Sequence, residues 1–342
     1  MHSTWVRALK LSFQYAVITA ALVALQPGRA VAVTLDADVT AFIDEYVSEH
    51  SFSRSKLQHW FAQARVQHGI LRAMENPTTS SPWHVFRASH VSAARINGGV
   101  AYWRRNADML AKISAESGVP EELLVATVGI ESFYGRLTGT SKVFDALVTL
   151  AFYYPKRAER FRGELGEFLL LTRELQVDPL QIKGSYAGAL GVPQFLPSSY
   201  RRYAVDGDGD GKRDLWNHGD ALASIANYYK GYGWQTGEPV LVQIEQSTEP
   251  VTDEFKTLVE RGILPHTTVG AVKRTGASPA FVVADDVKTA VFAAETEAGT
   301  RYWMGFNNFY VITRYNRSVN YALAVYELAQ ELRGLRRSET FD

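Results

Sequence analysis

Most of the chain has the hydrophobic spacing of helices. From Asp36 to about Ser117, apolar residues recur among polar ones at helical spacing, and a polar loop at Asn76–Pro82 interrupts them. The same kind of spacing predicts further helices along the chain, at Lys142–Tyr153, Lys156–Glu174, Ser198–Tyr203 and Ala221–Gly231. We therefore expect a mainly helical protein up to residue 237.

One predicted helix carries a carboxyl group on its apolar face. Pro120 and the acidic pair after it are typical of a first helical turn, and Gly135 provides a stop. Leu124, Val128 and Glu131 are four and three residues apart, so they share one face. Apolar neighbours disfavour a charged carboxylate, so the pKa of Glu131 should rise and the group could donate a proton near neutral pH. On spacing alone, a solvated or ion-paired Glu131 is the alternative.

Beyond about residue 238 the pattern changes from helical spacing to alternation. Three short runs have strand character, with turn signals between them: Pro239–Gln246, Phe281–Val283 and Thr289–Ala293. We therefore expect a small β-rich insertion at 238–304. A helix at Asn320–Leu335 follows, and the close spacing of Tyr321, Ala324 and Leu328 indicates that it packs back on the main body.

Composition and charge narrow the class of partner. The chain has 36 basic and 36 acidic residues, and a net charge of zero argues against nucleic acid or an acidic membrane as a bulk electrostatic partner. Aromatic residues make up 12%, which suits a groove for a stiff amphipathic polymer as well as a core. The sequence has no cysteine, which excludes a lipobox Cys, a disulfide and a thiolate metal site.

The first 32 residues have the features of an export signal. Two basic residues precede an apolar run from about Tyr15 to Leu25, and Ala30-Val31-Ala32 is a small-x-small cleavage site. The run is too short for a comfortable membrane span, and an ordinary first helix is the alternative. We therefore expect a signal peptide at 1–32 and a periplasmic protein with no stable membrane span after cleavage.

A run of small residues precedes a polar and aromatic segment. The glycine-rich stretch Gly184–Gly191 permits close backbone approach, and Val192–Tyr200 follows it directly. Within these segments, Ser185 and Gln194 offer hydrogen bonds to sugar hydroxyl and acetamido groups, and Phe195 offers a flat face to a sugar ring. A tight helix–helix contact followed by a turn fits the same composition, so the residues alone leave both interpretations open.

An acidic loop follows this segment. The first, third and fifth positions of an EF-hand-like pattern are occupied by Asp206, Asp208 and Asp210. Lys212 could give a backbone carbonyl, and Asp220 could replace the acidic residue missing from the end of the pattern. Hard oxygen ligands suit calcium, and clustered carboxylates repel one another without a cation. We expect a structural calcium site, with a solvated Asp/Gly turn as the alternative.

Five long motifs occur in a fixed order along the chain. They are GIESFYGRLTG, FDALVTLAFYYPKRAERFRGEL, DPLQIKGSYAGALGVPQFLPSSY, YAVDGDGDGKRDLWNHGDALASIANYYKGYGW and FYVITRYNRSVNYALAVYEL. Together they resemble the lytic murein transglycosylase B family over most of the chain, with less similarity in the N-terminal hundred residues. The anchored member of that family has a lipobox Cys, and this sequence lacks one, so outer-membrane attachment is not expected.

The resemblance implies a fold and a set of site residues. The fold is mainly α (α+β), with a lysozyme-like catalytic core, a helical domain and a small β-rich insertion. In this sequence the parts are a signal peptide at 1–32, a helical domain at 33–116, the core with its calcium-type loop at 117–237, the β-rich domain at 238–304 and a C-terminal return to the core at 305–342. The implied site residues are Glu131 as the one catalytic glutamate, Ser185 and Gln194 in the sugar groove, and Tyr228, Tyr310 and Tyr315. The family also has a metal in the acidic loop.

The groove motifs show no second acidic residue that is an obvious nucleophile, whereas most glycosidases use two carboxyl groups. The resemblance implies a reaction that needs only one carboxyl group. Glu131 would protonate the glycosidic oxygen of a MurNAc–GlcNAc β-1,4 bond, and the acetamido group of MurNAc would stabilise the cation at C1. Glu131 would then take the proton of the C6 hydroxyl as that oxygen attacks C1. The product is a 1,6-anhydro sugar, formed without water or a catalytic cofactor.

Two other functions fit the same motifs. A lysozyme-type muramidase would cleave the same bond by hydrolysis, and a non-catalytic peptidoglycan-binding scaffold would keep the groove without needing Glu131 as an acid. A calcium sensor is disfavoured because one irregular loop has no paired EF-hand. In every favoured case the partner is the peptidoglycan glycan strand, with other cell-wall enzymes as further candidates and no nucleic acid.

Overall fold

The computed structural model describes residues 31–75, 81–245 and 252–339. Most of the expected signal at 1–32 lies outside these residues, but Val31–Ala32 forms β1, which pairs antiparallel with β2 (Arg65–Val66). At the helix starts, side chains of Asp36, Ser53 and Ser92 accept backbone N–H groups. The N-terminal helices are α1 (Ala37–His50), α2 (Arg54–Gln63), α3 (His68–Glu75), α4 (Trp83–His90), α5 (Ala93–Arg105) and α6 (Ala107–Ser117).

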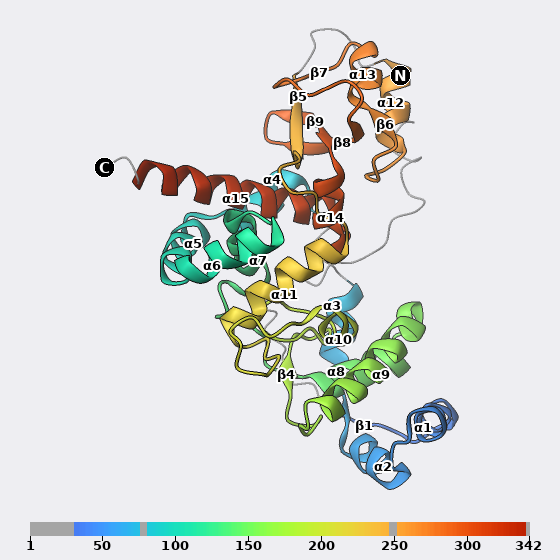
Figure 1. Cartoon of the computed structure of the whole chain (residues 1–342). Helices are drawn as coiled ribbons and strands as arrows, with labels where there is room; N and C mark the ends of the chain where they lie inside the picture. Colours follow the sequence, from blue (N-terminus) through green and yellow to red (C-terminus); the bar gives the residue numbers. More distant parts are fainter. Residues whose placement is uncertain (1–30, 76–80, 246–251, 340–342) are drawn as a thin grey trace.

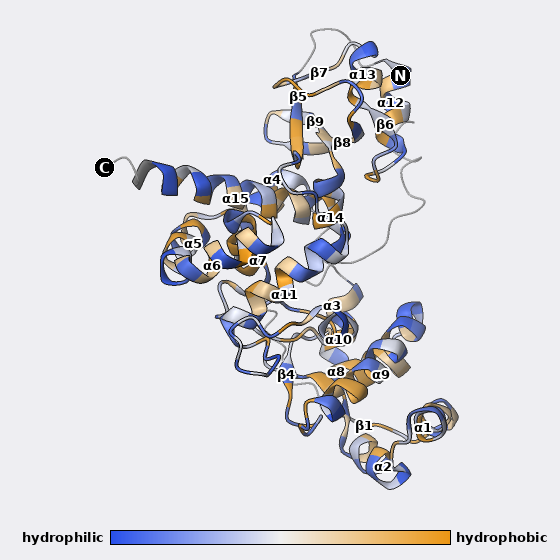
Figure 2. Cartoon of the chain, in the orientation of Figure 1, coloured by the Kyte–Doolittle hydropathy of each residue, from blue (hydrophilic) through white to orange (hydrophobic). Residues whose placement is uncertain are grey.

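The central helix is α7 (Glu121–Ser132), and it is buried along nearly its whole length. The elements that follow α7 in the central part of the chain are β3 (Ser141–Lys142), α8 (Val143–Tyr153), the 3₁₀ turn η2 (Pro155–Arg157), α9 (Ala158–Glu174), β4 (Lys183–Gly184), α10 (Pro197–Tyr203) and α11 (His218–Gly231). Each helix expected from the spacing is present, within a few residues at its ends. Figure 2 shows that α8 is mostly hydrophobic, in agreement with its place in the core.

The C-terminal part holds a five-stranded sheet at one end of the elongated molecule, with α1 and α2 at the other (Figure 1). Its strand order is β6-β8-β9-β5-β7, and each neighbouring pair is antiparallel. The elements are β5 (Leu241–Glu245), α12 (Asp253–Glu260), β6 (Thr267–Thr268), α13 (Val269–Arg274), β7 (Ser278–Pro279), β8 (Lys288–Thr296) and β9 (Gly299–Gly305).

Two expectations for this region need correction. The predicted strand at Phe281–Val283 is wrong, because these residues form an irregular segment after β7. Phe281 and Val282 are 51% and 97% exposed, so their apolar character does not reflect a buried strand. The region also contains two helices, α12 and α13, which the alternation did not predict.

The chain returns to the helical body through α14 (Asn307–Tyr315) and α15 (Val319–Glu339). As its spacing predicted, α15 packs on the main body, and its principal partner is α7. One hydrophobic core extends from Val33 to Leu332, and a separate core lies within the sheet region. Within the described ranges, none of the helices has the length and hydrophobicity needed to cross a membrane.

Candidate active site

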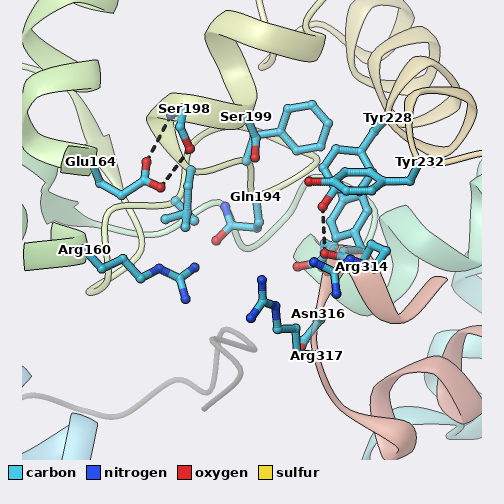
Figure 3. Close-up of a pocket in the computed structure, with 15 residues that line it drawn as sticks. Arg160, Glu164, Gln194, Ser198, Ser199, Tyr228, Tyr232, Arg314, Asn316 and Arg317 are labelled. Carbon is cyan, nitrogen blue, oxygen red and sulfur yellow. Dashed lines mark hydrogen bonds between the residues drawn. The ribbon is translucent and has the colours of Figure 1, made fainter. Parts of the chain in front are cut away.

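A pocket of about 230 Å³ opens to solvent where α7, α9, α11 and the end of α14 meet the segment before α10 (Figure 3). Its floor and walls combine carboxyl, guanidinium, amide and aromatic groups. The lining residues are Glu131, Arg160, Glu164, Ala189, Gln194, Phe195, Leu196, Ser198, Ser199, Tyr228, Tyr232, Arg314, Tyr315, Asn316 and Arg317.

Glu131 occupies the last turn of α7, and only 4% of the residue is exposed. The Tyr321 hydroxyl on α15 donates a 2.5 Å hydrogen bond to its Oε1 atom. Burial raises the pKa of Glu131 to about 8, and the hydrogen bond from Tyr321 opposes that rise because it stabilises the carboxylate. Glu131 is therefore largely protonated at neutral pH, and it lies on the surface of a pocket.

The backbone turns sharply just after Glu131. Phe133, Tyr134 and Gly135 have φ angles of +49°, +63° and +83°, so three successive residues are left-handed, two of them without the freedom of glycine. The Tyr134 N–H bonds to the Val128 carbonyl and closes the helix. The helix therefore ends at Ser132, before the expected stop at Gly135, and strained backbone accompanies the candidate catalytic residue.

Three aromatic rings that lie close together contribute to the lining of the pocket. The ring centroids of Phe195, Tyr228 and Tyr315 lie between 4.8 and 5.6 Å apart. Hydrogen bonds orient the two tyrosines, from the Tyr228 hydroxyl to the Arg314 carbonyl at 2.7 Å and from the Tyr315 hydroxyl to the Pro193 carbonyl at 2.5 Å. Phe195 and Tyr228 are only 2% and 5% exposed, so the partly exposed rings of Tyr232 and Tyr315 are the ones that can pack against a sugar.

Two buried amide oxygens at the pocket have no hydrogen-bond partner among the described residues: Gln194 Oε1 and Asn316 Oδ1. The Gln194 amide nitrogen donates to the carbonyls of Thr138 and Gly191 at 3.1 and 2.8 Å, which fixes the orientation of the amide. A buried acceptor without a donor is costly, so these oxygens are suited to hydroxyl or N–H groups of a ligand.

Ser185 and Tyr310 do not line this pocket. The Ser185 Oγ atom accepts backbone N–H groups from Ala187 and Ala189, and it stabilises its own loop. The Tyr310 hydroxyl lies 3.5 Å from a guanidinium nitrogen of Arg314. Of the residues expected from the sequence, the pocket therefore brings together Glu131, Gln194, Phe195, Tyr228 and Tyr315.

The small-residue run has the close backbone approach that its composition predicted. A Cβ atom at Gly184 would lie 2.2 Å from the Ala189 carbonyl oxygen, far closer than any real contact. Gly191 has a φ of +67°, and a Cβ there would lie 2.5 Å from the Leu215 carbonyl oxygen. Glycine is required at both positions, and the run places Gln194 and Phe195 at the pocket.

A second carboxyl group lines the pocket, contrary to the expectation of a lone acid. Glu164 on α9 is 8% exposed, and its two oxygens accept the backbone N–H and the hydroxyl of Ser198 at 3.0 and 2.7 Å (Figure 3). Burial raises its pKa, while the hydrogen bonds from Ser198 oppose the rise. Glu164 is thus engaged with the start of α10.

In the acidic loop, carboxylate oxygens of Asp206, Asp208 and Asp220 lie within 4.8 Å of one another. Asp206 accepts the N–H groups of Gly209 and Gly211, and the bond from Gly211 is the main reason that its pKa is lowered. Asp210 lies outside this group of three, and its carboxylate accepts the Lys212 N–H. The expected role of Lys212 rests on its backbone carbonyl and stays a prediction.

The pocket residues and partners that sequence reasoning missed include Tyr321, Asn316, Glu164 and Arg160. All four lie in motifs that carried the family resemblance, but no local pattern separates them from core or surface positions. Tyr321 has helical spacing with core residues, and it is fully buried, so its packing concealed its contact with Glu131.

A mainly helical fold with a buried carboxyl group of raised pKa, in a pocket with aromatic rings and amide acceptors, suits an enzyme that cleaves glycan strands. The chain matches the model described as "Transglycosylase SLT domain" over residues 34–330. It belongs to that transglycosylase family, and the resemblance found in the sequence is confirmed.

Relatives with known names agree with this assignment. The chain is 39% identical over 299 residues to the membrane-bound lytic murein transglycosylase B of Escherichia coli (strain K12), covering 84% of this chain and 81% of that protein. Catenated lytic transglycosylase SltB1 from Pseudomonas aeruginosa is 44% identical, with a TM-score of 0.82 over 88% of this chain and 98% of that one.

Two further structures were determined with ligands. Escherichia coli lytic transglycosylase Slt35 in complex with calcium is 37% identical, with a TM-score of 0.79 over 90% of this chain and 96% of that chain. Pseudomonas aeruginosa SltB3 in complex with NAG-anhNAM-pentapeptide is 29% identical, with a TM-score of 0.74 over 86% and 78%. These matches confirm the predicted fold class, mainly helical with a lysozyme-like core, and the prediction of a lytic transglycosylase.

Proposed function

We propose that this transglycosylase cleaves the MurNAc–GlcNAc β-1,4 bond of peptidoglycan glycan strands and forms a 1,6-anhydro-MurNAc end, with Glu131 as acid and then base. The observation that carries the proposal is the burial of the Glu131 carboxyl group at the pocket, where only 4% of the residue is exposed. This burial raises its pKa to about 8 and favours a carboxyl group that can donate a proton near neutral pH.

The chemistry needs one carboxyl group in two states. Glu131 gives its proton to the glycosidic oxygen as the C1–O bond breaks, and the bonding electron pair leaves with that oxygen. The substrate's acetamido oxygen stabilises the positive charge at C1. The C6 oxygen then attacks C1, and its proton passes to the Glu131 carboxylate. The Tyr321 hydroxyl donates to Oε1 and stabilises the carboxylate between the two steps.

The walls of the pocket support a sugar as ligand. The partly exposed rings of Tyr232 and Tyr315 offer stacking surface. The oxygens of Gln194 and Asn316, which have no partner among the described residues, can accept hydroxyl or acetamido N–H groups. The SltB3 complex adds support, because the name of its ligand includes an anhydro sugar. We keep Ser185 as a residue that positions the groove loop, and Tyr310 as a support for Arg314.

Glu164 favours a second candidate, a lysozyme-type hydrolase, because hydrolytic glycosidases commonly use two carboxyl groups. Two hydrogen bonds from Ser198 hold its carboxyl group at the start of α10. We prefer the intramolecular reaction because the chain belongs to a transglycosylase family.

Mass spectrometry of digested sacculi separates the two reactions. We expect soluble muropeptides with 1,6-anhydro ends, each about 18 Da lighter than the hydrated form, because no water enters the products. A digest in H₂¹⁸O should leave the new ends unlabelled. Hydrated, ¹⁸O-labelled reducing ends would instead establish the hydrolase and rule out the intramolecular route.

We also propose a structural calcium ion in the acidic loop, bound by Asp206, Asp208 and Asp220, with Asp210 and the Lys212 carbonyl as further candidates. The convergence of three carboxylate oxygens within 4.8 Å fits a hard cation. The Slt35 complex with calcium supports the same choice of metal. The ion would hold the loop between α10 and α11, and it takes no part in the chemical step.

Calcium should raise the melting temperature of the wild-type chain by roughly 5 °C at a concentration about 100 times Kd, because an ion that binds only the folded state stabilises it. The double substitution Asp206→Asn with Asp208→Asn should remove this rise in differential scanning calorimetry. Glu254→Gln, at an exposed position in α12, is the matched control and should keep it. An unchanged wild-type melting temperature with calcium would refute the site.

Two further expectations stay proposals. The signal-like segment at 1–32 supports export to the periplasm, where peptidoglycan is found, although the Escherichia coli relative is named as membrane-bound. The division at 33–116, 117–237, 238–304 and 305–342 is supported by the separate core of the sheet region.

A further inference from the structure

The side chain of Tyr134, three residues after Glu131, turns back into the contact between α5 and α7. Only 5% of Tyr134 is exposed, and its backbone is left-handed, with a φ of +63°. Glycines leave the space that its ring fills. A Cβ atom at Gly99 in α5 or at Gly129 in α7 would lie 2.5 or 2.6 Å from the Tyr134 hydroxyl oxygen, closer than real atoms approach. The ring therefore occupies a slot between the two helices that larger residues would close.

Two hydrogen bonds tie this slot to the last turn of α7. The Tyr134 hydroxyl donates to the backbone carbonyl of Arg95 at 2.7 Å, and the Arg95 Nε atom donates to the Gly129 carbonyl at 2.9 Å. The Gly129 carbonyl is one of the last four of the helix, which lack a donor from within the helix. The chain is thus fixed at Gly129, two residues before Glu131, and at Tyr134, three residues after it.

Arg95 is itself held by further contacts. It projects from the first turn of α5, and its Nη1 atom donates to the carbonyls of Ser89 and His90, at the end of α4, at 2.8 and 3.1 Å. Its guanidinium carbon lies 5.2 Å from the centroid of the Phe133 ring. Arg95 therefore connects the end of α4, the start of α5 and the turn that follows Glu131.

We propose that Tyr134 and Arg95 are positioning residues, which hold the last turn of α7 so that the Glu131 carboxyl group keeps its place at the pocket. The inference rests on the proposed function, because both residues act through Glu131. Neither lines the pocket, so a sugar bound there would not touch them. The raised pKa of Glu131 arises from burial, against the Tyr321 hydrogen bond, so the two residues act through geometry and not through charge.

The test is Tyr134→Phe, which keeps the ring in its slot and removes only the hydroxyl. On glycan oligomers of defined length, kcat should fall about tenfold and KM should stay within about twofold, because a displaced acid slows the chemical step without changing the contacts of the strand. Arg95→Gln removes the guanidinium donor to Gly129 and should lower kcat to a similar extent. The double variant should lose little more than either single variant, because both substitutions release the same turn.

The pH profile of kcat separates a positioning role from a loss of folded protein. A released turn lets water reach Glu131, so its pKa should fall from about 8 and the alkaline limb of the profile should move to lower pH. Three tyrosines face this carboxyl group and stay protonated in this range, because burial raises the pKa of each: Tyr229, Tyr315 and Tyr321. A smaller folded fraction would lower the apparent kcat but leave this limb in place.

Tyr154→Phe is the matched control, since that hydroxyl also donates to a backbone carbonyl, that of Met74 at 3.4 Å, and lies outside the pocket. It should keep the wild-type kcat and pH profile. Wild-type values in Tyr134→Phe, or a lowered kcat with an unmoved alkaline limb, would overturn the inference and leave the proposed function intact. A wild-type enzyme that cleaves no oligomer would refute the proposed function and the inference with it.

Discussion

Replacing Glu131 with Gln should lower kcat on purified sacculi by about 10³-fold or more while the protein stays folded. A Gln amide has nearly the same shape, and its oxygen can still accept the hydrogen bond from Tyr321. It cannot give a proton to the glycosidic oxygen or take one from the C6 hydroxyl, so both proposed steps lose their catalyst. Release of soluble muropeptides, followed by chromatography, measures the effect.

Two other glutamates provide controls for this experiment. Glu122→Gln changes the first turn of the same helix, away from the pocket, and should keep wild-type kcat. Glu164→Gln should lower activity less than tenfold, since its amide can still accept one hydrogen bond from Ser198. A Glu131→Gln enzyme with near-normal turnover, or a larger loss at Glu164, would show that the catalytic residue is assigned wrongly.

The sequence predicted the central helix because its signals are local. An acidic first turn, a run of apolar residues and a nearby glycine define α7, and helical spacing alone places Glu131 on a buried face. The raised pKa follows from that burial, so its direction could be inferred before the structure. The exact end of the helix could not be inferred from the sequence, because it depends on two non-glycine residues held in left-handed conformations.

The rest of the site depends on contacts between distant segments. Tyr321 lies 190 residues from Glu131 in sequence, and Glu164 is joined to Ser198 across 34. Local spacing classifies a buried tyrosine in α15 as core, and it gives no reason to bring α9 to the pocket. The incorrect prediction of a strand at Phe281–Val283 has a similar cause, because an apolar run alone does not show whether a sheet edge is available to pair with it.

The burial that makes Glu131 an acid should also make the protein less stable as pH rises. Its pKa is about 8 in the folded state against an ordinary value of 4.5, so the folded state holds a proton that the unfolded state releases between those values. The stabilising contribution of this proton is fully present below pH 4.5, declines by about 1.4 kcal/mol per pH unit above it, and is lost as pH rises through 8.

The Glu131→Gln variant should therefore be more stable than wild type, by on the order of 3 kcal/mol at pH 7. Gln carries no ionisable proton, so the stability difference should be small near pH 4.5, grow up to about pH 8 and then level off. Urea denaturation of both chains at pH 5, 7 and 9 measures this difference. Subtracting one free energy of unfolding from the other cancels the contributions of other buried groups with raised pKa values, such as Glu164. A difference that stays constant with pH would mean that Glu131 titrates normally, and the acid step would then lose its physical basis.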